Sequence, residues 1–241
     1  MKISYCKMKT FLLVILSFIS CFPVYSQELS VGTDFVSRYI WRGADLGGNT
    51  PSLHPTVEFS IAGLTAGFWG AYSLSDWRGL NEVDIYLNYS IELENSGSIN
   101  FGVIDYMNPN SGVKLGNFNN YDDPEGSGAH YIELNLGFTG TESLPISFSL
   151  NYFVHNLVDN PIYFEFGYST SVNDIGLDLF LGGTPGDDGE YYGVADFSMI
   201  HFGFTASKEI KITEDFSLPL FGSIIINPAS EDLFYVVGIS L

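Results

Sequence analysis

Apolar and polar positions alternate along most of the chain. In residues 83–93 the odd positions carry Val, Ile, Leu, Tyr, Ile and Leu, whereas the even positions carry Asp, Tyr, Asn, Ser and Glu. A period of two over a segment of this length predicts a β-strand with one apolar face and one polar face. The same alternation returns in residues 131–138, 146–155, 162–169, 175–181 and 200–207.

Across the whole region after residue 26, the pattern predicts an all-β protein of about twelve strands, with no helical period. Pro219 lies inside one of these strands, and because proline has no amide donor we expect it near the start of that strand. The strands are expected at residues 29–42, 52–61, 64–74, 82–93, 98–107, 129–138, 146–156, 162–171, 175–182, 197–211, 216–226 and 233–241.

The connections between these strands alternate in length. The short ones are residues 62–63, 94–97, 172–174 and 213–215, with 139–145 the longest of this set. The other set contains residues 43–51, 108–128 and 183–193, together with two short members, 157–161 and 227–232. Short turns at one rim and longer loops at the other are typical of outer-membrane β-barrels, and an even strand number places both ends at the short-turn, periplasmic rim.

Alternation by itself also fits a soluble β-sandwich. The strands, however, have the ~9–11 residues that a tilted transmembrane strand needs. Aromatic side chains also gather near strand ends on the apolar faces, as in the girdles at membrane interfaces. We therefore expect an antiparallel transmembrane β-barrel in the outer membrane, in contact with its lipid. The expected girdle residues are Tyr39, Trp41, Tyr72, Tyr89, Tyr168 and Tyr235.

The last strand has the form expected of a barrel terminus. Tyr235, Val237, Ile239 and Leu241 share one face, so the sequence ends on an apolar residue. Such a strand resembles the signal that the barrel-assembly machinery recognises, and we expect that machinery as a partner.

The N-terminal segment predicts a secretory signal peptide at residues 1–26, followed by a single barrel domain at residues 27–241. Three lysines precede an apolar run at residues 11–22, and Val24 and Ser26 occupy the −3 and −1 positions before Gln27. An uncleaved anchor and a lipoprotein signal at residues 18–21 are the alternatives.

The cysteine content and the net charge restrict the source of stability and the partners of the protein. Both cysteines fall in the predicted signal peptide, so the mature domain has no disulfide and needs a large core or a membrane for stability. The chain has 9 basic and 28 acidic residues, and removal of three lysines (9 − 3 = 6) leaves a net charge of −22. Nucleic acid and anionic lipid headgroups are therefore excluded as expected partners.

Residues 37–43, SRYIWRG, place two of the few basic residues in an aromatic setting. Read as a strand, this stretch puts Arg38 and Arg42 on the inner face and Tyr39 and Trp41 on the outer face. The same period assigns His155 and His201 to the lumen. The charged side chains expected to face the lumen are Asp34, Arg38, Arg42, Glu58, Asp84, Glu92, Glu133, Glu165 and Asp178.

This lumen set has two positive and seven negative members, a net charge of −5, and would favour cations if water fills the barrel. We expect Arg38 and Arg42 to reach acids on neighbouring walls, with Glu58, Asp84 and Glu92 as the candidates. Two interpretations remain open. The charges form a constriction with a transverse field, or they form a structural network that fills a small barrel.

Residues 34–61 followed by 63–73 resemble the TorF-like porin family of small outer-membrane barrels. The shared features are a first strand that ends in an aromatic-Arg-Gly turn, a second strand that contains proline, and a third that is rich in Gly and Trp. The resemblance covers about 40 residues. It implies an outer-membrane pore of unassigned substrate and brings no catalytic residues.

No pattern in the chain predicts a catalytic centre, a cofactor or a dedicated metal site. No pair of the four histidines has the close spacing of a metal site. Two acidic loops are candidates for binding Ca²⁺, although their acids lack the ordered spacing of a calcium loop. Their acids are Asp122, Asp123 and Glu125 in one loop and Asp187, Asp188 and Glu190 in the other.

The sequence therefore predicts a porin-like channel for small hydrophilic solutes, with a preference for cations. The alternatives are a closed structural or adhesion barrel that binds a partner through residues 108–128, and a lipid-modifying enzyme that uses His155 and His201.

Overall fold

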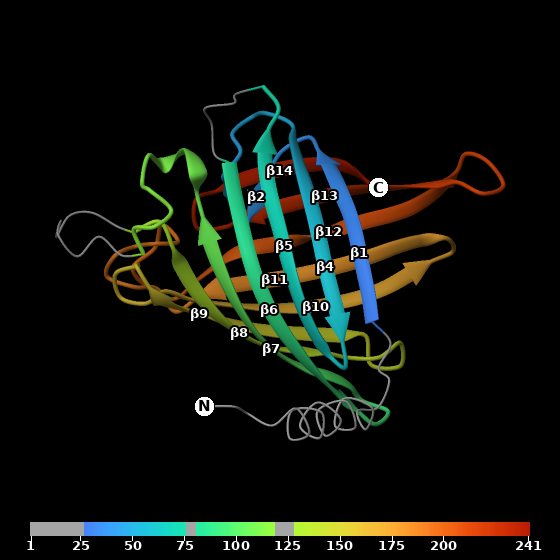
Figure 1. Cartoon of the computed structure of the whole chain (residues 1–241). Helices are drawn as coiled ribbons and strands as arrows, with labels where there is room; N and C mark the ends of the chain where they lie inside the picture. Colours follow the sequence, from blue (N-terminus) through green and yellow to red (C-terminus); the bar gives the residue numbers. More distant parts are fainter. Residues whose placement is uncertain (1–26, 76–80, 119–127) are drawn as a thin grey trace, which may run out of the picture.

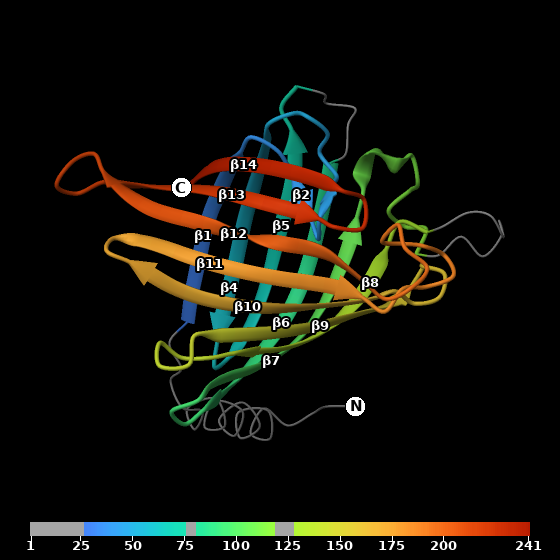
Figure 2. The same cartoon turned by 180° about the vertical axis from the view of Figure 1, so that it is seen from behind.

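The computed structural model describes residues 27–75, 81–118 and 128–241. They form a closed antiparallel barrel of twelve strands, in which the first strand, β1, pairs with the last, β14 (Figure 1; Figure 2). The predicted all-β barrel and its strand number are confirmed. The predicted signal peptide lies outside the described residues. No helix in the described part of the chain is long and apolar enough to cross a membrane.

Apart from the first, every predicted strand agrees with the structure to within two residues at each end. Pro219 is the third residue of its strand, as predicted. The barrel strands are β1 (Gln27–Val36), β4 (Ser52–Ile61), β5 (Leu64–Ser73), β6 (Asn81–Leu93), β7 (Gly97–Met107), β8 (Tyr131–Thr139), β9 (Ile146–His155), β10 (Ile162–Val172), β11 (Ile175–Thr184), β12 (Ser198–Lys211), β13 (Ser217–Asn227) and β14 (Asp232–Ser240).

The two rims differ as the connection lengths predict. Short turns join the strands at one end, here called the turn rim, and the longer connections lie at the other end, the loop rim. The β4–β5 turn consists of Ala62 and Gly63, both with positive φ (53° and 81°), as a tight type I′ hairpin requires. A 3₁₀ turn at Pro109–Ser111 belongs to the loop rim.

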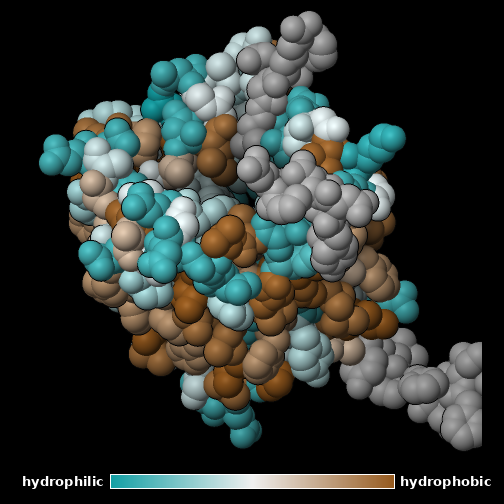
Figure 3. Space-filling model, turned by 90° about the vertical axis from the view of Figure 1, so that its left-hand side faces the viewer, coloured by the Kyte–Doolittle hydropathy of each residue, from teal (hydrophilic) through white to brown (hydrophobic). Residues whose placement is uncertain are grey.

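The outer face of the barrel is apolar and the inner face is mostly polar, except where Val36, Ile225, Phe234 and Val236 form a buried apolar cluster. On β6, Ile85, Leu87 and Tyr89 point outward and are 55%, 44% and 47% exposed. Asn88 and Ser90 alternate with them and are half-buried on the inner face. In Figure 3, which looks from the left-hand side of Figure 1, hydrophilic residues gather over the loops while hydrophobic residues cover the flank below them.

The prediction of one long strand at residues 29–42 is wrong beyond Val36. The chain leaves β1 there and forms a small hairpin of β2 (Ile40–Trp41) and β3 (Ala44–Asp45). Its turn is Arg42–Gly43, where both residues have positive φ (49° and 79°), which reverses the chain within two residues. We call residues 37–47 the inner hairpin, because its side chains contact walls on the far side of the lumen, described next.

Candidate functional site

Arg42, at the tip of the inner hairpin, crosses the lumen to Glu133 on β8. Its two terminal nitrogens donate to the two carboxylate oxygens at 2.6 and 2.9 Å. Its guanidinium also donates to the Tyr192 hydroxyl at 2.7 Å and lies 4.4 Å from the ring centroids of both Trp41 and Tyr163. The Arg42 side chain is 10% exposed and that of Glu133 is 0% exposed, so this bidentate pair is removed from water.

Both carboxylate oxygens of Glu133 accept hydrogen bonds. Beside Arg42, it accepts hydrogen bonds from the Tyr106 hydroxyl at 2.9 Å and from the Asn135 amide at 3.0 Å. A buried carboxylate is stable only with such partners. The pair therefore fixes the hairpin tip to the far wall of the barrel, and each partner depends on the other.

Tyr39 and Trp41 lie inside the barrel, so the prediction that they belong to an outer girdle is wrong. Tyr39 is 7% exposed, and its hydroxyl donates to Glu82 at 3.2 Å. The Trp41 ring lies 6.0 Å from the Tyr106 ring, measured between centroids. The physical reason is the Arg42–Gly43 turn, which folds both faces of this segment into the lumen.

A second connection of the loop rim also contacts Arg42 and Trp41. Residues 185–197, between β11 and β12, carry Tyr191 and Tyr192. Burial raises the pKa of Tyr192 to about 12, so its phenol remains neutral while it accepts from Arg42. Sequence reasoning missed both tyrosines because a loop has no period. The available signal was a pair of adjacent aromatic residues in an otherwise acidic, glycine-rich segment.

Burial of the inner wall decreases from the loop rim to the turn rim. On β6, Glu82 and Asp84 are buried, Asn88 and Ser90 are half-buried, and Glu92 is exposed. Strand β9 repeats this order, with Asn151 buried, Ser149 half-buried and Ser147 exposed. The inner hairpin and residues 185–197 thus fill the loop half of the lumen, whereas the turn half of these two strands is lined by polar residues and is more exposed to solvent.

The two arginines find partners that the sequence did not indicate. Arg42 pairs with Glu133, and Arg38 lies 3.5 Å from Asp45 within the hairpin itself. The predicted partners Glu58, Asp84 and Glu92 are not used, because the hairpin carries both arginines away from the wall of β1.

The other predicted lumen residues lie in separate small networks. Asp34 faces His54 across the β1–β4 pair, Glu58 accepts from Tyr86 at 2.7 Å, Glu165 lies 2.8 Å from His201, and Asp178 accepts from Ser169 at 2.6 Å.

His155 does not face the lumen with His201. The β8–β9 register shifts between Ile132 and Glu133, so that His155 pairs with the outward Ile132 while Phe153 pairs with the inward Glu133. The His155 ring lies 4.6 Å from the ring of Phe118, on the long β7–β8 loop. This bulge breaks the period of two, and the two histidines cannot form one site.

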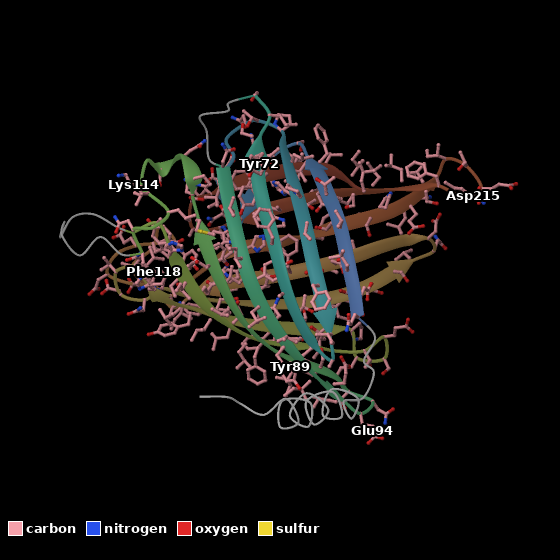
Figure 4. The ribbon with its side chains drawn as sticks, in the orientation of Figure 1. Tyr72, Tyr89, Glu94, Lys114, Phe118 and Asp215 are labelled. Atoms are coloured by element: carbon pink, nitrogen blue, oxygen red, sulfur yellow. The ribbon has the colours of Figure 1, made fainter. Side chains whose placement is uncertain are left out.

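The remaining girdle residues lie on the outer face. Tyr72, Tyr89, Tyr168 and Tyr235 are between 39% and 64% exposed. Tyr72 lies toward the loop rim and Tyr89 toward the turn rim, where Glu94 and Asp215 mark two turns (Figure 4). Lys114 and Phe118 mark the opposite, loop end in the same view.

The acidic loops do not gather into a metal site within the part of the chain that the structure describes, where no group of three or more His, Cys, Asp or Glu side chains comes together. Asp187 instead accepts a hydrogen bond from the Tyr191 amide at 3.2 Å. Asp188 and Glu190 are exposed on the same loop. Asp122, Asp123 and Glu125 lie outside the described residues.

Comparison with known proteins gives a family and a fold. The model of a family described as "Bacterial protein of unknown function (Gcw_chp)" matches residues 23–178. A solved chain described under "Unveiling the Mechanism Behind the in-meso Crystallization of Membrane Proteins" has a TM-score of 0.50 and 9% sequence identity, covering 90% of this chain and 83% of that chain. At this identity the likeness is one of fold alone. No curated protein matches the sequence.

Proposed function

The chain belongs to the Gcw_chp family of bacterial proteins of unknown function, and from this premise we propose that it is an outer-membrane channel for small hydrophilic solutes. The observation that carries the proposal is the inner wall, which is polar apart from an apolar cluster around Val36, Ile225 and Phe234. The polar wall is exposed to solvent toward the turn rim, as on β6 and β9. The inner hairpin, packed against Tyr191 and Tyr192, fills the loop half of the lumen. Opening then requires the hairpin to leave its place.

Three observations support the membrane location. The outer face exposes large apolar side chains on every wall, far beyond the patches that soluble monomers show. Outward tyrosines lie toward both rims, as girdle residues do. The solved chain with the same fold comes from work on membrane proteins. The resemblance of residues 34–73 to TorF-like porins adds the outer membrane and a pore, and the apolar outer face of β14 fits recognition by the barrel-assembly machinery.

The charges of the open half favour cations. Arg42 is neutralised by Glu133 and Arg38 by Asp45, so neither arginine offers its charge to a passing ion. Exposed or half-buried acids remain on the wall, among them Glu58, Glu92 and Asp178. An acidic lining raises the local concentration of cations.

We propose no enzymatic activity. Among the described residues, His201 is bonded to Glu165 and to the Tyr163 hydroxyl, and no serine or cysteine is among its partners. A closed barrel that binds a partner through its loops is the second candidate, and the filled loop half of the lumen is the observation that favours it.

Conductance separates the two candidates. The purified barrel in planar bilayers should give brief openings, with a reversal potential in a KCl gradient that moves toward the K⁺ value. Glu92→Gln combined with Asp178→Asn should reduce this cation preference, because both acids lie at the exposed end of the lumen. A closed barrel would carry no current in the unmodified protein or in either of the hairpin variants described in the Discussion.

A pair of neighbouring substitutions tests the membrane location. Leu87 faces outward and Asn88 faces inward on β6. Arginine on a lipid-facing strand costs ~2–4 kcal/mol near the bilayer midplane, whereas a lumen position tolerates it. We expect Leu87→Arg to lower the urea midpoint of the barrel folded in vesicles, and Asn88→Arg to leave it nearly unchanged. Equal effects of the two variants would contradict a lipid-facing outer surface.

A further inference from the structure

A cavity of about 280 Å³ lies at the loop rim, beside the inner hairpin. Its walls come from the hairpin, from β6 to β9 and from the loops at their ends. Tyr191, one of its lining residues, is 39% exposed, so the cavity reaches the loop-side surface. Neither Arg42 nor Glu133 lines it, although two of its lining residues contact that pair: Trp41 packs on Arg42 and Tyr106 donates to Glu133.

Four rings form a closed circuit around this cavity. The centroid distances are 6.0 Å from Trp41 to Tyr106, 5.6 Å from Tyr106 to Phe153, 5.3 Å from Phe153 to Tyr191, and 6.5 Å from Tyr191 back to Trp41. All four rings line the cavity. Rings arranged in this way present both apolar surface and negative π faces, which attract cations.

The cavity also contains a carboxylate. Glu82 lines it, is 8% exposed, and receives the Tyr39 hydroxyl at 3.2 Å. Two residues along the same inner face of β6, Asp84 is 7% exposed, and its Oδ1 has no hydrogen-bond partner among the residues that the structure describes. Within the described residues no lysine or arginine pairs with either acid. A buried carboxylate without a cation is costly and takes up a proton instead, so a cation bound beside Glu82 would stabilise its ionised form.

The neighbouring Arg42–Glu133 site shows how a cation is held by the same kinds of groups. There, the Arg42 guanidinium lies between the rings of Trp41 and Tyr163 and is bonded to Glu133. Counting Arg42 against Glu82, Asp84 and Glu133 in their ionised forms gives +1 − 3 = −2. The cavity beside Glu82 likewise combines aromatic rings with a carboxylate, but no lysine or arginine among the described residues pairs with Glu82.

We propose that this cavity binds an organic ammonium ion, with the charged nitrogen beside Glu82 and the apolar part among the rings of Trp41, Tyr106, Phe153 and Tyr191. The proposal does not depend on conduction. A barrel that binds such a cation and carries no current would refute the channel and retain the site.

Choline and its uncharged carbon analogue, 3,3-dimethylbutan-1-ol, form a matched pair of probes, because they have nearly the same shape and differ in charge. We expect choline to bind the folded barrel in nanodiscs saturably by calorimetry, with a change in tryptophan fluorescence, and about tenfold or more tighter than the alcohol. Binding that is absent, or equal for the two probes, would overturn the proposal.

Substitutions locate the bound cation. Glu82→Gln should weaken choline binding about tenfold or more and leave the alcohol unaffected. Glu92→Gln removes the same charge from the same face of the same strand at the exposed turn end, and should leave choline binding unchanged. Tyr191→Leu, on a loop, should weaken binding several-fold even if the β6 variant fails to fold. Choline binding that survives both Glu82→Gln and Tyr191→Leu would assign the cation to another place and overturn the proposal.

Discussion

Arg42→Met should raise the single-channel activity of the barrel, with the fraction of time spent open increasing about 100-fold or more. The substitution keeps an unbranched side chain at the hairpin tip but removes both bonds to Glu133, which is 0% exposed. Loss of one partner from a buried pair costs ~3–5 kcal/mol, and each 1.4 kcal/mol changes an equilibrium tenfold. Arg42 also bonds Tyr192, so this cost falls on the docking of the hairpin and of residues 185–197, whereas the backbone pairing of the twelve-stranded wall remains.

The control for this experiment is Arg38→Met on the same hairpin. Arg38 pairs with Asp45 at 3.5 Å, with both side chains more than a fifth exposed, and such pairs contribute ~0–1 kcal/mol. Its removal should leave the open fraction nearly unchanged. The double variant Arg42→Met with Glu133→Gln also removes the unpaired charge of Glu133, but it does not restore the attachment of the hairpin to β8. It should therefore be more stable than Arg42→Met and still conduct. An Arg42→Met barrel that folds and stays silent would show that the lumen is closed by more than the hairpin.

The strands could be predicted from the sequence because each wall of the barrel separates an apolar surface from a polar one. On β6, the alternation of Leu87 with Asn88 is a local property and needs no knowledge of the partner strands. The same reasoning failed at residues 37–43, where the two arginines and the two aromatic residues fall on opposite parities although the chain has left the wall. The sign of a turn in the sequence is Gly43, because glycine readily adopts the positive φ that the Arg42–Gly43 turn requires.

The site could not be predicted because its partners are distant along the chain. Arg42 and Glu133 are 91 residues apart, and Arg42 and Tyr192 are 150 apart. The period of two correctly assigned Glu133 to the inner face, yet it could not say which inward acid a hairpin tip would meet. That choice depends on how far the hairpin reaches across the lumen. The bulge beside Glu133 likewise turned His155 outward, an effect of pairing that no single strand reveals.

Gly43→Ala should also release the hairpin, without changing any charge. Gly43 has φ +79°, and a Cβ added there would lie 1.9 Å from the Ile200 carbonyl oxygen. This oxygen belongs to Ile200 of β12, which is 1% exposed and lies between Met199 and His201, both paired with β11, so it has little room to move. The same displacement would break the bond from the Asn227 amide to the Gly43 carbonyl, now 3.2 Å. We expect a rise in open fraction similar to that of Arg42→Met.

Gly48→Ala provides the matched control, because Gly48 also has positive φ (+64°) but a Cβ there would meet nothing within 4 Å. It should carry only the conformational cost of ~1–2 kcal/mol and leave the conductance unchanged. The two releasing variants share no chemistry, so their agreement identifies the hairpin as the closing element. If Arg42→Met conducts and Gly43→Ala does not, the charge of Arg42, and not the position of the hairpin, controls the current. If neither conducts while both keep the heat-dependent gel shift of a folded barrel, the protein is a closed barrel and its function lies at the loop rim.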